Sequence, residues 1–385
     1  MMACNARHAG ARGLPGWEGS GALRKHLEQK RSVRAVSSRP WPLRPVRRQQ
    51  PDPSGSLARG MADRSSALLD ASWKEPLQGA SPTVALGKFD ALHRGHQKLV
   101  ATAANLKPSS TPYLISFDGM AGVLGWEPRL PLVAACDRSR VLGSWVKVCA
   151  GVVPRERGIP FSKVRHLSPE EFVGLLAEDL GAVGVVVGSN YRFGYKAAGT
   201  ADTLKTLGAA YGMKVEVVNL VERMNQTGLG DTVSSSAVRG GLAAGDMAGV
   251  EECMGRPYRL VGMAGIGVTK GLGSVEGRRV WSRWHVEAGG LMNQYPAAGS
   301  YQVKVGFVDA AVAGEKIVSL GEGYGEGEDV IFRAGRAVFD ERGAATVDLL
   351  GGNDRGDDGG DDDGMAALVS RRDQLMCVLE FVRPV

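Results

Sequence analysis

Residues 83–96, TVALGKFDALHRGH, join a short apolar strand to the start of a helix. The apolar run ends at Gly87, and apolar residues then recur at helical spacing over residues 99–106. A second apolar run, residues 113–117, follows. A strand, a helix and a strand in this order predict a crossover unit of a parallel sheet.

The alternation of helices and strands continues for another hundred residues. We expect a helix over residues 168–180. It begins with Ser-Pro-Glu-Glu, which supplies an N-cap, a proline at the first helical position and a capping-box glutamate. We expect a buried strand over 183–187, a helix over 200–211 and a strand over 214–220. About five such alternations predict a Rossmann-like, doubly wound α/β domain, which we assign to residues 80–257.

The pattern changes after Tyr258 to short segments rich in Val and Gly. Several short strands predict a small β-barrel-like domain over residues 258–385. The expected strands cover residues 301–305, 316–320, 329–332, 345–350 and 376–382. The Asp- and Gly-rich residues 351–364 lack the spacing of a calcium loop, so we expect a disordered, solvated loop there.

The composition and cysteine pattern exclude several classes of protein. The 385 residues are 43% hydrophobic and 23% charged, which argues against a disordered chain and allows about two domains of roughly 150 residues. No stretch approaches the roughly 20 apolar residues of a membrane-spanning helix. The five cysteines are scattered without a C-x-x-C pair, so we expect neither a zinc site nor a disulfide framework.

The net charge of +6 is concentrated at the N-terminus. Residues 1–64 contain 13 Lys and Arg against 4 Asp and Glu, which leaves the remaining residues at a net charge of −3. This stretch is Arg-rich and lacks the apolar segment of a secretory signal, so it predicts a plastid or mitochondrial transit peptide. Val33-Arg34-Ala35 resembles a stromal processing site, and we expect a location in the chloroplast stroma. A nucleic-acid-binding arm and a gene model begun before Met61 are alternatives. We expect no nucleic-acid or membrane partner for the remaining, slightly acidic part, and the oligomeric state is not predicted.

The first candidate site is the turn that contains His93 and His96. A helix that starts at the carboxyl end of a parallel strand presents free N–H groups and a partial positive charge to a phosphate. Gly95 allows a polyphosphate to approach the backbone, and both imidazoles can donate to phosphate oxygens. A pair of surface histidines is the alternative, and zinc is disfavoured because no third ligand is close in sequence.

Two further motifs lie at expected ligand-binding positions. Ser234, Ser235 and Ser236 precede Arg239 by about one helical turn, so the hydroxyls and the guanidinium can contact one anion. An ordinary serine N-cap with a surface arginine is the alternative. Residues 188–196, GSNYRFGYK, follow the predicted strand 183–187, at the sheet edge where ligands bind, although their aromatic residues can equally belong to the core.

In this order, the motifs resemble the FMN adenylyltransferase module of FAD synthetases, in the nucleotidyltransferase superfamily marked by His-x-Gly-His. The resemblance runs from about Thr83 to Tyr258 and includes LSPEEF at 167–172 and MGRPY at 254–258. Asn190 and the residues after it look most like the plant and algal plastid enzymes.

The resemblance implies transfer of AMP from ATP to FMN, giving FAD and pyrophosphate, with Mg²⁺ accompanying ATP and no metal-ligating side chain. It implies catalytic roles for His93, His96, Asn190 and Arg239. It implies ATP binding by Gly87, Phe89, Asp90, His93, Gly95, His96, Gly188, Ser234, Ser235, Ser236 and Arg239. It implies FMN binding by Tyr191 and Phe193.

Two departures from the family pattern lie near these motifs. Ala91 occupies a position where the family usually has Gly, and Gly240-Gly241 should weaken the helix after Arg239 by roughly 1 kcal/mol per glycine relative to alanine. Neither is a ligand-binding side chain.

Bacterial bifunctional relatives continue into a riboflavin kinase barrel with a Pro-Thr-Ala-Asn motif. Residues 267–294 contain no such motif, although YPAAGSY at 295–301 resembles the turn that follows it. We therefore expect an FAD synthase without riboflavin kinase activity. A bifunctional enzyme, a non-catalytic flavin- or nucleotide-binding protein, and a transferase acting on pantetheine phosphate or a nicotinamide nucleotide are the alternatives.

Overall fold

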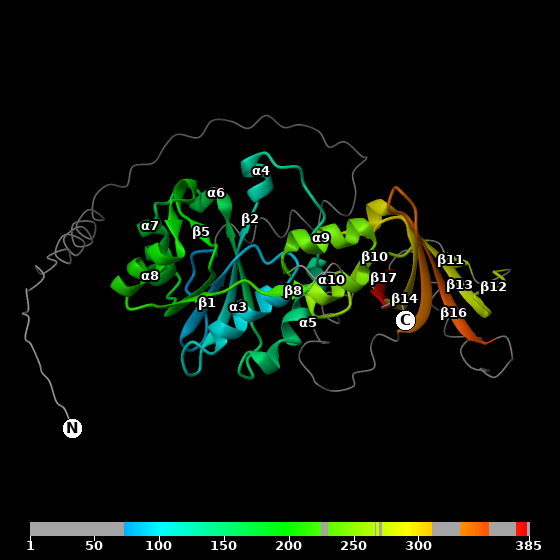
Figure 1. Cartoon of the computed structure of the whole chain (residues 1–385), viewed down its shortest axis with the longest axis horizontal. Helices are drawn as coiled ribbons and strands as arrows, with labels where there is room; N and C mark the ends of the chain where they lie inside the picture. The colour runs from blue at the N-terminus through cyan, green and yellow to red at the C-terminus, as the bar shows by residue number, and fades with distance from the viewer. Residues whose placement is uncertain are drawn as a thin grey trace, which may run out of the picture. The chain divides into compact units, whose positions relative to one another are not determined.

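The computed structural model describes residues 73–224, 230–265, 267–268, 272–309, 332–353 and 375–382. Its first half contains a five-stranded parallel sheet in the order β3-β2-β1-β4-β7. Figure 1 shows two of its paired strands, β1 and β2. The strands are β1 (Pro82–Leu86), β2 (Thr111–Asp118), β3 (Arg155–Pro160), β4 (Gly184–Gly188) and β7 (Lys214–Val218). Two small hairpins pair β5 (Arg192–Phe193) with β6 (Gly199–Thr200) and β8 (Glu222–Met224) with β9 (Gly230–Thr232).

Helices cover both faces of the parallel sheet. The α-helices are α3 (Arg94–Ala104), α4 (Met120–Leu124), α5 (Arg138–Gly143), α6 (Phe161–Val164), α7 (Pro169–Gly174), α8 (Ala201–Ala210), α9 (Ser235–Ala244) and α10 (Met247–Met254). A π-helical turn, η3 (Leu175–Asp179), continues α7, and short 3₁₀ turns cover η1 (Ala135–Asp137), η2 (Val146–Val148), η4 (Tyr195–Ala197) and η5 (Ala288–Gly290).

The alternation of side chains along β1 separates two apolar clusters. Ala85 belongs to the cluster that contains α3, α9 and α10, whereas Val84 and Leu86 belong to the cluster that contains α7 and α8. Ser168 caps α7 with the predicted capping box. The predicted doubly wound α/β architecture is therefore confirmed.

The strand order places a switch point between β1 and β4. From β1 the chain proceeds outward to β2 and β3, and from β4 it proceeds to β7 on the other side. The connections that leave the carboxyl ends of β1 and β4 consequently diverge, which is where open α/β sheets bind ligands. The first candidate motif follows β1, and residues 188–196 begin at the end of β4.

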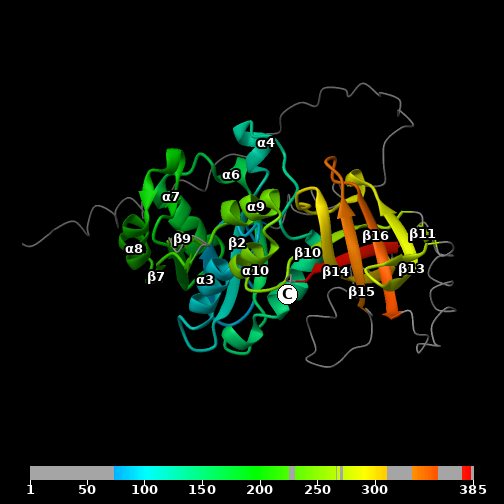
Figure 2. The ribbon, with the colours of Figure 1, turned by 45° about the vertical axis from the view of Figure 1, so that its right-hand side comes forward.

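The second half is an antiparallel sheet with strand order β10-β17-β14-β15-β16-β13-β11, and β12 pairs with β13 (Figure 2). Its strands are β10 (Arg259–Met263), β11 (Gly267–Val268), β12 (Ser274–Val275), β13 (Arg278–Val286), β14 (Gly299–Asp309), β15 (Arg333–Phe339), β16 (Ala345–Asn353) and β17 (Leu375–Phe381). Among the described residues, β10 and β11 at the two ends of this order do not pair, so the sheet is barrel-like but not closed. These two end strands follow one another along the chain, and between them the N–H of Gly265 donates to the carbonyl of His285 in β13 at 2.9 Å.

Some predicted features of this half lie outside the described residues. These are the strand over 316–320, most of the strand over 329–332, and the loop beyond residue 353; residues 1–64 lie outside them too. The first three residues of the predicted loop, 351–353, continue β16 instead. In the part of the chain that the structure describes, no helix has the length and apolar character needed to cross a bilayer.

The two sheets share one apolar core through α9 and α10. The cluster that contains Val238 of α9 and Val250 of α10 also includes Trp284 and Val303 of the antiparallel sheet. A Cβ built on Gly241 would lie 2.7 Å from Cγ2 of Val250, so this glycine permits the close approach of α9 and α10. It is therefore a packing residue as well as a poor helix former.

Substitution of the two adjacent glycines of α9 by alanine should have opposite effects. Gly240 has no atom within 4 Å of a built Cβ, so Gly240→Ala should raise the free energy of unfolding by up to about 1 kcal/mol. Gly241→Ala should lower it, because β-branched Val250 has little rotamer freedom in a helix and overpacking costs roughly 1–3 kcal/mol. Urea unfolding measures both, and the Val250→Ala background should relieve Gly241→Ala. Equal effects of the two alanines would contradict this account.

Candidate active site

His93 is the N-cap of α3. Its backbone is extended (φ −80°, ψ 174°), and its ring Nδ1 accepts the N–H of His96 at 3.2 Å. A neutral ring that accepts at Nδ1 carries its proton on Nε2. The turn therefore fixes the tautomer of His93 and leaves Nε2–H as its donor.

The rings of His93 and His96 stack on each other. Their centroids are 3.6 Å apart with an interplanar angle of 18°, and the Phe89 ring meets His96 edge-on at 4.9 Å. Both histidines are buried, His93 at 6% and His96 at 9% exposure. They are not the pair of surface histidines that the sequence left as an alternative.

Burial keeps both imidazoles neutral. Loss of solvation, followed by the positive charge of Arg256, lowers the pKa of His93 from 6.5 to about 4. Burial and the neighbouring His93 lower the pKa of His96 well below 6.5. His96 Nδ1 is buried without a hydrogen-bond partner among the described residues. The pair consequently offers N–H donors to an anion but no formal charge.

Two arginines hold the turn between β1 and α3. Phe89 (φ 33°) and Leu92 (φ 47°) both adopt left-handed backbone conformations, which are costly for bulky residues. Arg256 donates to the carbonyl oxygens of Leu92 at 2.6 Å and Ala91 at 3.0 Å. Arg138 donates to the carbonyl of Phe89 at 3.0 Å. These bonds satisfy the carbonyls of the strained turn.

Neither arginine was assigned a role from the sequence. Arg256 belongs to the MGRPY segment at 254–258, and no motif of the sequence contains Arg138. Burial, together with the charge of Arg140, lowers the pKa of Arg256 to about 9. Ala91, where the family usually has Gly, is not among the positions with positive φ, which explains why alanine is tolerated there.

An ion pair joins the first and second motifs. Arg239 Nη2 donates to Asp90 Oδ2 at 2.8 Å and to the carbonyl of Leu130 at 2.9 Å. The other carboxylate oxygen of Asp90 accepts the N–H of Leu132 at 2.9 Å. Arg239 Nη1 donates to Gln294 Oε1 at 3.3 Å, a contact that the sequence did not predict.

The starts of α3 and α9 lie close together. A Cβ built on Gly95 would be 3.0 Å from Cε1 of His93 and 3.9 Å from the carbonyl oxygen of Val233. Ser234 caps α9 by accepting the N–H of Ala237 at 3.1 Å, and Ser235 and Ser236 form its first turn. Two helix N-termini with their partial positive charges therefore converge on one region.

The third motif occupies the carboxyl end of β4. Tyr191 N–H bonds to the Gly188 carbonyl at 3.0 Å, and the turn so formed leaves Asn190 exposed. Phe193 is 5% exposed and packs against Phe172 with ring centroids 5.5 Å apart. Phe193 thus contributes to the apolar core, and Tyr191 is partly buried beside it.

Gly87, at the end of β1, lies over the Phe89 ring, because a Cβ built there would be 3.2 Å from Cζ of Phe89. The structure thus brings together Gly87, Phe89, Asp90, His93, Gly95, His96 and Arg239, with Ser234, Ser235 and Ser236 adjacent. It records no direct hydrogen bond between these residues and Gly188, Asn190, Tyr191 or Phe193. Among the described residues, no group of three His, Cys, Asp or Glu side chains is arranged to hold a metal ion.

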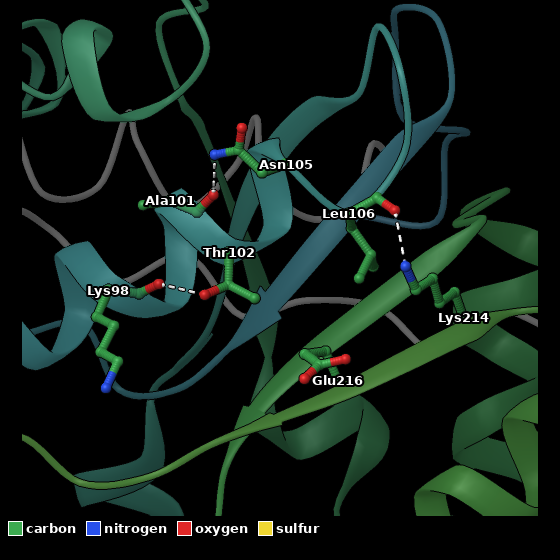
Figure 3. Close-up of a pocket in the computed structure, with 7 residues that line it drawn as sticks. All are labelled: Lys98, Ala101, Thr102, Asn105, Leu106, Lys214 and Glu216. Carbon is green, nitrogen blue, oxygen red and sulfur yellow. Dashed lines mark hydrogen bonds between the residues drawn. The ribbon is translucent and has the colours of Figure 1, made fainter.

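An open depression of about 420 Å³ lies elsewhere (Figure 3). It is lined by Lys98, Ala101, Thr102, Asn105, Leu106, Lys214 and Glu216. These residues belong to the C-terminal part of α3, the residues after it and the start of β7, whereas His93 lies before the first turn of α3. None of the predicted site residues lines it, so it is distinct from the candidate site.

The chain is similar to known proteins in sequence and in fold. Residues 77–237 match the family model described as FAD synthetase. The chain is 43% identical over 240 residues to FAD synthetase 1, chloroplastic, of Arabidopsis thaliana, which covers 58% of this chain and 65% of that protein. It is 49% identical over 199 residues to FAD synthetase 2, chloroplastic, of the same plant, covering 48% of this chain and 53% of that protein.

More distant relatives extend the comparison. A bifunctional riboflavin kinase/FMN adenylyltransferase of Pseudomonas fluorescens is 31% identical over 181 residues, 46% of this chain and 55% of that protein. The chain therefore spans less than two thirds of the length of each of these three curated relatives. A crystal structure described as a macrolide-efflux protein from Streptococcus pneumoniae superposes with a TM-score of 0.54 over 81% of this chain and 90% of that chain, at 18% identity, and shows a shared fold.

The buried His93 should make folding stability depend on pH. An unfolded chain protonates this residue near pH 6.5 but the folded chain near 4, so the free energy of unfolding should fall as the pH is lowered from 6.5 to 4. The difference corresponds to about 3 kcal/mol. Denaturant unfolding at several pH values should show that the free energy of unfolding depends less steeply on pH in His93→Gln than in the unchanged protein. His285→Gln, at an exposed position of β13, is the control, and equal slopes in all three proteins would contradict the prediction.

Proposed function

We propose that the chain transfers the adenylyl group of ATP to FMN, giving FAD and pyrophosphate, a proposal supported by the match of residues 77–237 to the FAD synthetase family model. The observation that carries the proposal is the convergence of the α3 and α9 starts beside the Asp90–Arg239 pair. Helix starts, neutral N–H donors and one guanidinium together suit a polyphosphate.

The transfer needs positioning more than chemical activation. The terminal phosphate of FMN is already an anionic nucleophile, so it attacks the α-phosphorus of ATP directly and pyrophosphate leaves from the opposite side. The new bond joins an FMN phosphate oxygen to the α-phosphorus, and the bond to the bridging oxygen of the leaving group breaks. No covalent enzyme intermediate is required.

We assign roles to the site residues on this basis. His93 donates Nε2–H to phosphate oxygens, and the unpartnered ring nitrogen of His96 adds a second polar contact. Arg239 supplies the positive charge that the neutral histidines lack, and charge that develops on pyrophosphate is best met by such fixed groups. Asp90 holds the guanidinium in place.

The remaining assignments follow the family. Gly87, Phe89 and Gly95 shape the turn, Gly188 and Asn190 orient the nucleotide from the end of β4, and Ser234, Ser235 and Ser236 bind phosphate at the start of α9. Tyr191 is assigned to FMN binding, and Phe193 is assigned to support it from the core, because the two rings stack.

Magnesium enters the proposal as part of the substrate. We propose that Mg²⁺ accompanies ATP and would be held by phosphate oxygens and water, as is usual for nucleotide substrates. The named residues bind the phosphates rather than the ion.

We also propose that residues 80–257 form the adenylyltransferase domain and that residues 258–385 lack riboflavin kinase activity. In residues 267–294, where the kinase motif is missing, the hydroxyl of Ser282 is fully buried and accepts the indole N–H of Trp284 at 3.1 Å. Trp284 is itself fully buried against Phe307. Side chains thus fill this part of the sheet, and the hydroxyl of Ser282 already has a hydrogen-bond partner.

The names of the Arabidopsis relatives support a chloroplast location for this chain. Residues 1–64 would then act as the transit peptide. A bifunctional activity is the second candidate, since the Pseudomonas fluorescens relative carries that name.

Loss of the His93 donor should abolish most activity. Purified protein incubated with ATP, Mg²⁺ and FMN should produce FAD and pyrophosphate, and His93→Ala should lower the turnover by roughly 10²-fold or more while the protein stays folded. Chromatography of the flavins and circular dichroism measure the two properties. His285→Ala is the matched control and should retain activity. Near-normal FAD formation by His93→Ala would refute the assignment.

Riboflavin in place of FMN separates the two candidate functions. The protein should form neither FMN nor FAD from riboflavin, ATP and Mg²⁺. Accumulation of FMN, or of FAD without added FMN, would establish kinase activity and reject the monofunctional reading.

A further inference from the structure

The connection between η5 and β14, residues 291–298, reaches from the antiparallel sheet to the candidate site. Gln294 accepts from Arg239 Nη1 at 3.3 Å, and its own N–H donates to the carbonyl of Pro131 at 2.8 Å. A residue that belongs to neither the family match nor the predicted site thus contacts the one guanidinium assigned to phosphate.

The backbone of Gln294 is held by a buried polar network. Asn293 is fully buried and donates to Tyr258 Oη at 3.0 Å, to the Arg259 carbonyl at 2.9 Å and to the Leu132 carbonyl at 3.3 Å. Its carboxamide oxygen accepts the N–H of Val261 at 2.9 Å. Every polar group of Asn293's side chain is engaged, so the position of the connection is fixed with little freedom.

The contacts form a closed circuit. Gln294 bonds to Arg239, Arg239 bonds to Asp90, and Asp90 bonds to the N–H of Leu132. The carbonyl of Leu132 accepts from Asn293, which is adjacent to Gln294. The guanidinium therefore has three acceptors: the Asp90 carboxylate on the β1–α3 turn, the carbonyl of Leu130, and the amide of Gln294 on the connection between η5 and β14.

The chemistry of Gln294 suits a positioning role. An amide oxygen orients the guanidinium without adding charge, whereas a second carboxylate beside Asp90 would leave the group with a net negative charge, which repels phosphate. We propose that Gln294 is a positioning residue of the adenylyl-transfer site, through which the antiparallel sheet holds Arg239 in the orientation that binds the ATP phosphates. The assignment of ATP to this site rests on the proposed function.

Equilibrium binding of MgATP to the full chain, measured by calorimetry, tests the proposal independently of turnover. Gln294→Ala should weaken binding roughly tenfold, the usual effect of losing a hydrogen bond to a charged group. Gln294→Glu should weaken it further, although it preserves the shape of the side chain. Gln302→Ala and Gln302→Glu, at an exposed position of β14, are matched controls and should bind like the unchanged protein.

A double-mutant cycle with Arg239→Ala separates positioning from general destabilisation. If Gln294 acts through Arg239, Gln294→Ala should have little further effect on MgATP affinity in the Arg239→Ala background. Additive losses, or unchanged binding by both Gln294 variants, would overturn the proposal. Failure of Gln294→Ala, Gln294→Glu and Gln294→Met all to fold would also overturn it, because the role would then be structural.

FAD formation distinguishes this inference from the proposed function. With FMN present, the Gln294 variants should show a raised KM for ATP and a smaller change in kcat. If the unchanged protein binds MgATP but makes no FAD, the proposed function is rejected. The double-mutant cycle on MgATP affinity then still decides whether Gln294 acts through Arg239. If the unchanged protein does not bind MgATP, both are rejected.

Discussion

The ion pair between Asp90 and Arg239 connects residues 149 positions apart and fixes the geometry of the candidate site. Both side chains are about one quarter exposed, so the pair contributes little to overall stability by itself. Its value is geometric, because each partner also bonds to the backbone of residues 130–132. Together with Gln294, which accepts from Arg239, four separate segments meet at one carboxylate and one guanidinium.

The polar groups of the candidate site differ in the charge that they carry. The histidines that first attract notice in the sequence are buried and neutral, so they supply directed N–H donors. Positive potential comes from Arg239 and from the helix starts. Such a division lets the histidines lie against Phe89 in an apolar setting without the cost of burying an isolated charge.

The sequence predicted the parallel sheet, and the placement of two motifs after the carboxyl ends of β1 and β4, because strand alternation, helix caps and the order of elements are local signals. Ser168 and its capping box illustrate this. The stacking of His93 on His96 was not predictable from their spacing, since His93 precedes the helix and has an extended backbone. The roles of Arg138 and Arg256 were missed because their acceptors are main-chain carbonyls around left-handed, non-glycine residues, which carry no sequence signal. Gln294 was missed because long-range contacts do not follow from composition or periodicity.

The shared core has a consequence for how the two halves of the chain can change over evolution. Apolar residues of α9 and α10 pack in one cluster with Trp284 and Val303, so each half alone would expose apolar side chains that the other half covers. A gene that lost the antiparallel sheet would leave this cluster open to water. We therefore expect the sheet to be needed for packing against α9 and α10 whether or not it has chemistry of its own, and substitutions to be tolerated best on the side that faces away from the shared interior.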